Sequence, residues 1–282
     1  MEDAKEAQVQ RLVSVAIIAA IAVGWGAIVL VVNVGLVVAL VATGTTFGEI
    51  AQLKLPPTSL VITTGVQFLA MAALSIGIAR LAAPYRPFGT TASLLGHRRS
   101  LGGMTLLLAA ACGATVGWLP GWLAATMRTL LPQLELGTIG LVQGVLQEGP
   151  WIQRLAMVAI VAVIGPVAEE WLFRGLLYDT VRRHAGPIGT VVATSLAFSA
   201  FHMDPVQGIP LLFTGAVFGA LREVTGSVAP AIAAHIANNA LGVALGVTAV
   251  SAEPNLLPSV IAALAALLAL AGVARREAPV PA

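Results

Sequence analysis

Residues 12–42 read LVSVAIIAAIAVGWGAIVLVVNVGLVVALVA, an apolar run without a charged side chain. A helix needs about 20 apolar residues to cross the hydrocarbon core of a bilayer, so this run is long enough to span it with a tilt or a bend. It also exceeds the apolar core of a signal peptide, about 7–15 residues. Acidic Glu2, Asp3 and Glu6 stand where a signal peptide would be basic. We therefore expect a first membrane-spanning helix that is retained.

The composition of the whole chain indicates the same environment. Of its 282 residues, 58% are hydrophobic and 10% are charged, and the mean hydropathy is +0.92. A soluble domain has about 25% charged residues, so this chain has too few polar residues to cover a surface in water. Disorder, coiled coils and nucleic-acid binding need dense charge and are excluded as leading interpretations. The single cysteine, Cys112, excludes an intrachain disulfide and a cysteine-based metal site.

Apolar runs separated by proline, glycine and charge predict an all-α, polytopic membrane protein of about eight spanning helices. In this interpretation residues 1–282 form a single integral membrane domain, with no soluble domain and no sequence repeat. The longest connection, about residues 128–151, carries leucines that favour the membrane interface. The predicted spans are 12–42, 58–83, 101–127, 152–180, 187–203, 207–224, 227–250 and 255–274.

Basic residues at the ends of these spans give the expected orientation. Only Lys54, Arg128 and Arg154 lie on or near one side, whereas the other basic residues, apart from Arg174 within a span, lie on or near the side of the N-terminus. Because cytoplasmic loops are rich in Lys and Arg, both termini are predicted to be cytoplasmic. The alanine- and glycine-rich composition favours a bacterial cytoplasmic (inner) membrane.

Two pairs of glycines have a spacing that allows helices to approach closely in lipid. They are Gly215 with Gly219 and Gly242 with Gly246. Such pairs are also frequent by chance in a glycine-rich membrane protein, so both interpretations stay open and neither assigns chemistry to these residues.

Away from the ends of the predicted spans, ionisable residues are few and clustered. Glu169, Glu170 and Arg174 lie in one span, His202 ends the next, and His235 lies in another. A charge at the centre of a bilayer costs about 2.5–3.5 kcal/mol on insertion scales, so a sequence retains it only where it is paired or used. The cluster therefore predicts a functional site inside the helical bundle.

Spacing within the cluster suggests how the charges are arranged. Glu170 and Arg174 are four residues apart, with the acid first, which is the better order for an ion pair on a helix. Glu169 is about 100° around the same helix and must face a polar group from elsewhere in the bundle. Pro166 has no N–H, so the carbonyl of Ala162 is expected to lack its helical hydrogen bond.

The second half of the cluster combines hydrogen-bond donors with an aromatic wall. His235 and Asn239 share a helix face and can both donate to an oxygen that gains negative charge. Phe198 shares a face with His202 and can exclude water from it. From the residues alone, three interpretations remain open: water activation for hydrolysis, a proton relay in a transporter, and a metal site.

Three motifs in this region resemble a known family. Residues 169–174 read EEWLFR, residues 198–202 read FSAFH and residues 235–239 read HIANN. They resemble the EExxxR, FxxxH and HxxxN motifs of the CPBP family, the CaaX proteases and bacteriocin-processing enzymes also called the Abi family. The motifs occur in family order, and the motif-bearing core covers about residues 155–245.

The resemblance implies an intramembrane endopeptidase with eight helices that cuts a membrane-anchored or lipidated protein near its C-terminus. Within the CPBP family, the sequence resembles the type II CaaX prenyl endopeptidases. Some bacterial members of this family are myxosortase-like sorting enzymes. No cofactor is required in this interpretation. The roles it implies are water activation by Glu169, water binding by His202, an oxyanion hole of His235 and Asn239, and support of the site by Glu170, Arg174 and Phe198.

Alternatives to this function remain at the level of sequence. A zinc-dependent version of the protease would use Glu169, His202 and His235 as ligands, although His235 would then no longer be a free donor. A transporter would be expected to show inverted repeats, whereas the polar cluster occurs only in the second half. A non-catalytic immunity scaffold would be expected to lack a motif residue, and none is missing.

Overall fold

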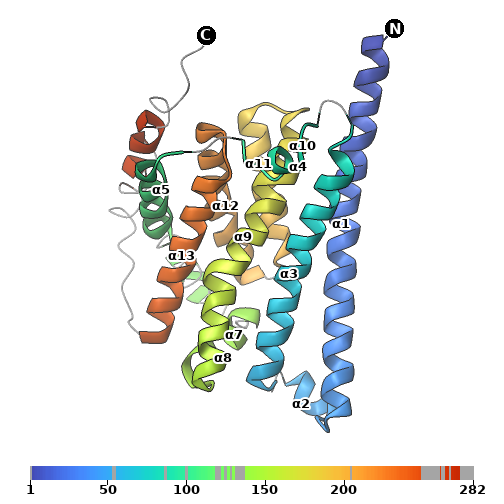
Figure 1. Ribbon diagram of the computed structural model, residues 1–282. Coiled ribbons are helices and arrows are strands. Elements are labelled where there is room, and N and C mark those ends of the chain that lie inside the picture. The colour runs from blue at the N-terminus through green and yellow to red at the C-terminus, as the bar shows by residue number, and fades with distance from the viewer. Residues whose placement is uncertain are drawn as a thin grey trace.

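The structure is a computed structural model, and every regular element in the part of the chain that it describes is helical (Figure 1). The described residues are 2–52, 55–85, 88–98, 101–117, 122–123, 126–127, 129–130, 137–203, 205–248, 261, 264–266 and 268–273.

Two long helices form one side of the bundle. Helix α1 (Glu2–Ala42) and helix α3 (Pro57–Ala82) lie side by side, and the short helix α2 (Phe47–Ala51) joins them at one end (Figure 1). A capping box between Thr46 and Glu49 starts α2 and satisfies backbone N–H groups that have no helical partner. The outward face of α1 exposes aliphatic side chains, including Val23 and Val31, as expected for a surface in contact with lipid.

The central element is one continuous helix that runs from Trp151 to Arg182. It consists of α8 (Trp151–Ala159), α9 (Gly165–Glu170) and α10 (Tyr178–Arg182), separated by two π-helical segments, η1 (Ile160–Ile164) and η2 (Trp171–Leu177). In η1 the N–H of Gly165 donates to the carbonyl of Ile160, five residues earlier. Each π-helical segment adds to the residues per turn, so it changes which side chains beyond it face the bundle.

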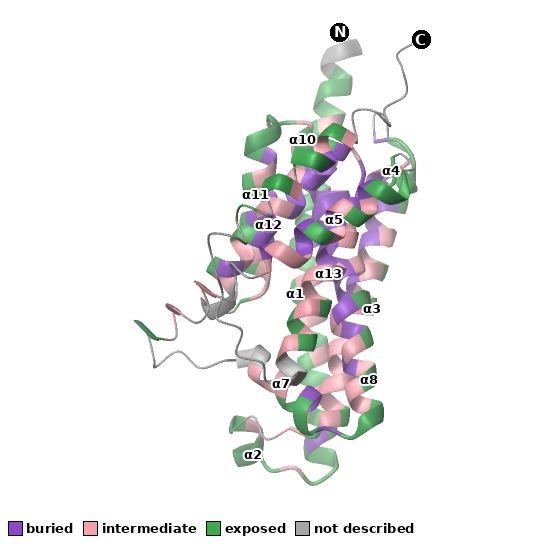
Figure 2. Ribbon diagram, turned by 90° about the vertical axis from the view of Figure 1, so that its left-hand side faces the viewer, coloured by how far each residue is buried: buried purple, intermediate pink, exposed green. Residues whose placement is uncertain are grey.

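The last helices pack against this central element. Helices α11 (Pro187–Phe201) and α12 (Pro205–Thr225) form a hairpin, and α13 (Ala229–Thr248) packs against α5 (Gly103–Val116). Buried residues concentrate where these helices meet the central one (Figure 2). The largest buried cluster joins α1, α3, η2 and α11, with Ile17, Met71, Leu172, Phe173 and Phe198 among its members.

The all-α, polytopic class predicted from the sequence is confirmed. Within the described residues, three helices are long and apolar enough to span a membrane: Lys5–Ala42, Pro57–Ala82 and Trp151–Arg182. Shorter apolar helices occupy Gly103–Val116, Pro187–Phe201 and Ala229–Leu245.

One predicted span is longer than the helix in the structure, and another lies mostly outside the described residues. The span expected at 101–127 is shorter, because α5 ends at Val116. The span expected at 255–274 lies mostly outside the described residues. Three elements were not predicted: α2, α4 (Thr91–Leu94) and α7 (Gly137–Glu148), the last within the connection expected at about 128–151.

The glycine pairs behave differently in the structure. A Cβ on Gly215 would lie 3.1 Å from Nη2 of Arg174, and one on Gly219 would lie 3.1 Å from Cγ1 of Val191. This pair therefore lets α12 approach α11 and the central helix. Among the described residues, no atom lies within 4 Å of a Cβ built on Gly242, so none of them approaches this glycine closely.

A third glycine sets the distance between α5 and α13. A Cβ on Gly113 would collide with the backbone of Ala234, the residue before His235. We predict that Gly113→Ala lowers the free energy of unfolding by about 1–3 kcal/mol, because overpacking forces the two backbones apart. The free energy of unfolding in detergent micelles is the measurement.

The matched control for this prediction is Gly77→Ala in α3. Gly77 has open space around its Cβ position, so alanine should leave stability unchanged or raise it by about 0.5–1 kcal/mol through helix propensity. Equal effects of the two substitutions would contradict the close α5–α13 contact.

Candidate active site

Three helices bring Glu169, His202 and His235 together. Glu169 lies in α9, His202 is the C-terminal cap of α11, and His235 lies in α13. Oε1 of Glu169 is 3.7 Å from Nε2 of His202, and its Oε2 is 3.4 Å from Nε2 of His235. The carboxylate thus faces two imidazoles across the bundle.

The site is deep within the central helix. Glu169 lies near the middle of the apolar span Trp151–Arg182, several helical turns from either end. Glu169 and His235 are buried, whereas the His202 side chain is 23% exposed. His202 is therefore the member of this group that a molecule entering the site can approach.

The ring of His235 lies between two carboxylates that are adjacent in sequence. Its Nδ1 is 2.9 Å from Oε1 of Glu170, and its Nε2 faces Glu169. The ring of Phe218 stacks on it with centroids 4.7 Å apart, and Phe198 meets it edge-on at 5.8 Å. These contacts hold the imidazole plane in one orientation.

The tautomer of His202 follows from its backbone contact. Its Nδ1 lies 2.8 Å from the carbonyl oxygen of Phe198, and a carbonyl can only accept, so Nδ1 carries the proton. In the neutral ring the lone pair is then on Nε2, which points toward Glu169. Phe198 also packs edge-on against the His202 ring with centroids 4.9 Å apart, as the shared helix face predicts.

The structure contains the ion pair predicted between Glu170 and Arg174. Nη1 of Arg174 donates to Oε1 of Glu170 at 3.0 Å, and both side chains are fully buried. Nη2 donates to the carbonyl of Gly215 at 2.8 Å, and the guanidinium carbon lies 4.5 Å from the centre of the Phe198 ring. Arg174 thus links Glu170 to α11 and α12.

Asn239 contacts the backbone of the central helix. Its Nδ2 donates to the carbonyl of Val161 at 2.9 Å, and its Oδ1 accepts from Asn238. The expected free carbonyl was that of Ala162, but the π-helical register places Val161 opposite Pro166, which has no N–H to donate. The Asn239 amide therefore supplies a hydrogen bond that the proline cannot.

A second layer of charge lies behind Arg174. Nε of Arg222 donates to the backbone carbonyl of Arg174 at 3.0 Å, and its Nη2 donates to Asp179 at 2.7 Å. The sequence interpretation took Arg222 as an arginine that orients the chain, yet it is only 4% exposed. The sequence analysis did not assign Asp179 and Arg222 to the site, because charged residues are common at the ends of membrane spans. Only their burial in the folded protein distinguishes them from other charged residues at span ends.

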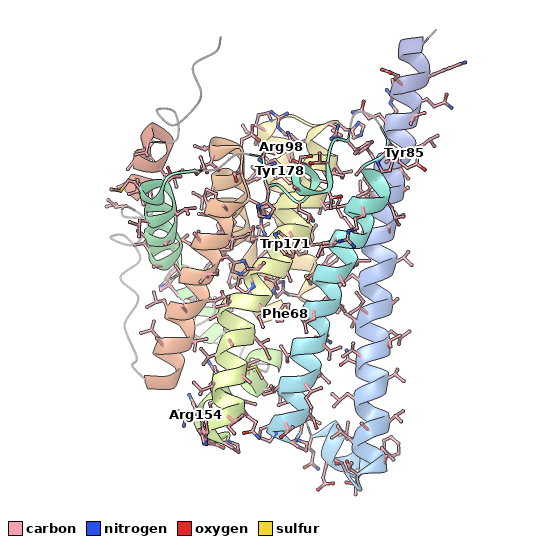
Figure 3. The ribbon with its side chains drawn as sticks, in the orientation of Figure 1. Phe68, Tyr85, Arg98, Arg154, Trp171 and Tyr178 are labelled. Atoms are coloured by element: carbon pink, nitrogen blue, oxygen red, sulfur yellow. The ribbon has the colours of Figure 1, made fainter. Side chains whose placement is uncertain are left out.

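A residue of the EEWLFR motif connects the site to a loop. The indole N–H of Trp171 donates to Nε2 of His97 at 2.9 Å. Partial burial lowers the pKa of His97 below its usual value and favours the neutral ring that can accept this bond. Figure 3 shows Trp171 between the end of the bundle that carries Arg98 and Tyr178 and the opposite end that carries Arg154.

The geometry of these side chains bears on the zinc interpretation. Glu169, His202 and His235 lie together, but within the described residues no group of three His, Cys, Asp or Glu side chains has a geometry that could hold a metal ion. His235 turns both ring nitrogens toward carboxylates. The residues present do not form a zinc site in this arrangement.

These features define the class of protein: an all-helical membrane protein with a buried glutamate that faces two histidines. Residues 150–241 match the family model described as Rce1-like, type II CAAX prenyl endopeptidase Rce1-like. The matched segment contains all three motifs and is similar to the CPBP/CAAX protease family, whose members are intramembrane endopeptidases, hydrolases that act on peptide bonds. Comparisons with curated proteins and with solved structures found no match.

Breaking the buried ion pair should be costly. We predict that Arg174→Gln lowers the free energy of unfolding by about 3–5 kcal/mol, because it leaves the Glu170 carboxylate buried without its cation. Unfolding in detergent micelles measures the change.

The comparison for this prediction is Arg182→Gln. Arg182 pairs with Glu223, and both side chains are partly exposed, so Arg182→Gln should change the free energy of unfolding far less than Arg174→Gln. If the two substitutions had similar effects, the Glu170–Arg174 pair would not be supporting the site.

Proposed function

We propose that this protein is a metal-independent intramembrane endopeptidase that cuts a peptide bond near the C-terminus of a membrane-anchored or lipidated protein. The observation that carries the proposal is the position of Glu169, within 3.7 Å of His202 and 3.4 Å of His235 in the centre of the bundle. A bacterial cytoplasmic membrane with cytoplasmic termini remains our expectation for its location.

In the proposed mechanism Glu169 and His202 prepare the nucleophile. Oε1 of Glu169 and Nε2 of neutral His202 are both hydrogen-bond acceptors, and their separation allows one water to lie about 2.8 Å from each. Such a water donates both of its hydrogens to them, which leaves an oxygen lone pair for attack on the scissile carbonyl. Glu169 takes the proton as the carbon–oxygen bond forms.

His235 and Asn239 then stabilise the tetrahedral intermediate. Nδ1 of His235 donates to Glu170, so its Nε2 can donate to an oxyanion only when the ring is an imidazolium. Carboxylate oxygens face both ring nitrogens, Oε1 of Glu170 at 2.9 Å from Nδ1 and Oε2 of Glu169 at 3.4 Å from Nε2. Asn239 has two amide hydrogens and gives one to Val161, which leaves the other for the oxyanion.

Collapse of the intermediate completes the reaction. The carbon–nitrogen bond breaks, and Glu169 returns its proton to the leaving amine. The products are a released C-terminal peptide and a new carboxylic acid on the substrate, which becomes a carboxylate when it releases the second proton of the water. Glu170 and Arg174 keep His235 in place throughout and do not touch the reacting atoms.

Other functions for the same residues are less well supported. A proton relay would use buried acids along a path through the membrane, yet Glu169 and Glu170 both converge on His235. An immunity scaffold would not need a glutamate that faces two histidines. The matched family model also favours peptide-bond hydrolysis.

The decisive substitution is Glu169→Gln. We predict a loss of cleavage of at least about 100-fold, because the amide cannot accept a proton from water, while thermal unfolding in detergent stays near that of the unchanged protein. His202→Ala should have an effect of the same order. Substrates can be found as membrane proteins that retain their C-terminal tails in cells carrying Glu169→Gln.

The control for this experiment is Glu148→Gln. Glu148 lies at the exposed end of α7, so the same chemical change should leave cleavage intact. Normal cleavage by the Glu169→Gln protein would eliminate the proposed base.

A separate prediction concerns Asn239. If its amide binds the oxyanion, Asn239→Ala and the isosteric Asn239→Asp should each lower kcat by about 100-fold to 1,000-fold with little change in KM. Steady-state kinetics on a tail peptide in detergent measures both constants. Reduced stability with an unchanged kcat would show instead that Asn239 serves only to join α13 to η1.

A further inference from the structure

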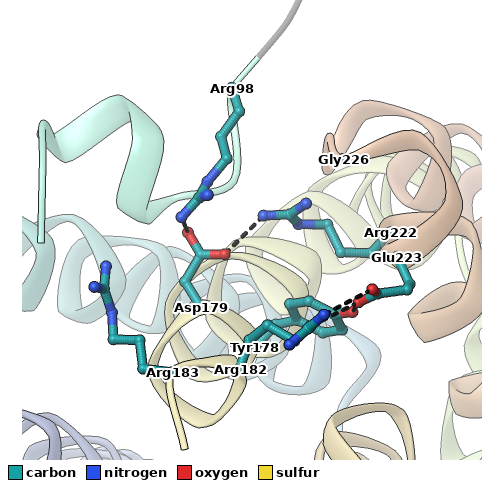
Figure 4. Close-up of a pocket in the computed structure, with 8 residues that line it drawn as sticks. All are labelled: Arg98, Tyr178, Asp179, Arg182, Arg183, Arg222, Glu223 and Gly226. Carbon is teal, nitrogen blue, oxygen red and sulfur yellow. Dashed lines mark hydrogen bonds and ion pairs between the residues drawn. The ribbon is translucent and has the colours of Figure 1, made fainter. Parts of the chain in front are cut away.

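A cationic pocket of about 450 Å³ lies at one end of the bundle, outside the proposed active site. Four arginines and two carboxylates line it, from the end of the central helix, from α12 and from the loop that precedes α5 (Figure 4). Its volume is in the range of ligand pockets, about 300–1,000 Å³. None of the roles proposed above for cleavage requires this pocket.

Carboxylates hold three of the four guanidinium groups before any ligand arrives. Asp179 lies between two of them, accepting from Arg98 at 2.8 Å and from Arg222 at 2.7 Å. Glu223 accepts from Arg182 at 3.2 Å and also from the hydroxyl of Tyr178. Figure 4 shows Asp179 between Arg98 and Arg222, and Glu223 beside Arg182 and Tyr178. Little side-chain entropy remains to be lost when an anion binds.

The balance of charge favours an anion. Four guanidinium groups line the pocket against two carboxylates, so the pocket keeps an excess of positive charge. A guanidinium has five N–H donors in a planar fork, and the bond from Arg98 to Asp179 uses one nitrogen. Arginine forks match the oxygens of a phosphate group in paired hydrogen bonds.

The position of the pocket favours a phosphate that belongs to a lipid. Arg182 is the last residue of the apolar span Trp151–Arg182, which places the pocket at the level where headgroups begin. Exposed aliphatic side chains lie next to it in the chain: Val224 follows Glu223, and Ile188 lies in the first turn of α11. Acyl chains can rest on such a surface while the headgroup enters the pocket.

We propose that this pocket binds the phosphate of an anionic phospholipid headgroup at the membrane surface. The proposal does not depend on peptidase activity. Arg98 and Arg182 are the best residues to test it, because their side chains are 46% and 39% exposed. The more deeply buried Arg222 also supports Arg174 and is left unchanged.

The test is native mass spectrometry of the full chain in detergent, titrated with phosphatidylglycerol, phosphatidylcholine or inorganic phosphate. We expect one saturable site for phosphatidylglycerol that is at least about 10-fold tighter than any site for phosphatidylcholine. The double substitution Arg98→Gln, Arg182→Gln should weaken it by about 10-fold or more, because two guanidinium groups that can bind the phosphate are lost. Single Arg182→Gln should give a smaller loss in the same direction.

The matched control is Arg80→Gln, which removes an exposed arginine from the last turn of α3, outside the pocket. It should bind phosphatidylglycerol as tightly as the unchanged protein. An equal loss in this control, equal binding of both lipids, or unchanged binding by the double variant would each overturn the proposal. If inorganic phosphate displaced phosphatidylglycerol at a comparable concentration, the pocket would be a site for free phosphate, and the proposal of a lipid ligand would be wrong. Unchanged thermal unfolding without lipid verifies that the variants are folded.

Discussion

The Glu170–Arg174 ion pair is the interaction on which the rest of the site depends. A carboxylate with no exposed surface holds Nδ1 of His235 on one side and the Arg174 guanidinium on the other. Arg174 in turn binds the Gly215 carbonyl and stacks on Phe198. A pair buried this deeply adds little net stability on its own, but it fixes α11, α12 and α13 relative to the central helix, and Glu169 meets its histidines only in that arrangement.

The backbone of the central helix makes this convergence possible. Glu169 and Glu170 are neighbours in sequence, and the imidazole of His235 fits between their side chains because each ring nitrogen contacts one of the two carboxylates. The π-helical segments on either side of α9 change the rotation of the helix along its length, and they leave carbonyls outside the usual ladder. Asn239 uses one of these, at Val161, to attach α13. Departures of this kind from α-helical geometry are frequent at functional sites.

The features that could be predicted from the sequence are those that depend on residues close together along the chain. The class of fold follows from long uncharged runs, and the Glu170–Arg174 pair follows from a spacing of four residues. The juxtaposition of Glu169 with His202 and His235 was expected because a charge in lipid needs a partner. The π-helical segments were not predicted, since one extra residue in a turn leaves no mark in an apolar pattern. Asp179 and Arg222 were not predicted either, because their burial depends on how distant helices pack.

The order of the charges along the chain has a consequence for biogenesis. Segments of a membrane protein enter the bilayer in the order of synthesis, before later segments exist. Glu170 carries its counter-ion one turn further along the same helix, so the two enter as a neutral unit. The partners of Glu169 belong to helices made afterwards. Until those arrive, Glu169 has no partner from another helix, and an unpaired charge in lipid is costly. The residue proposed as the base is therefore also the one whose insertion depends on later parts of the polypeptide.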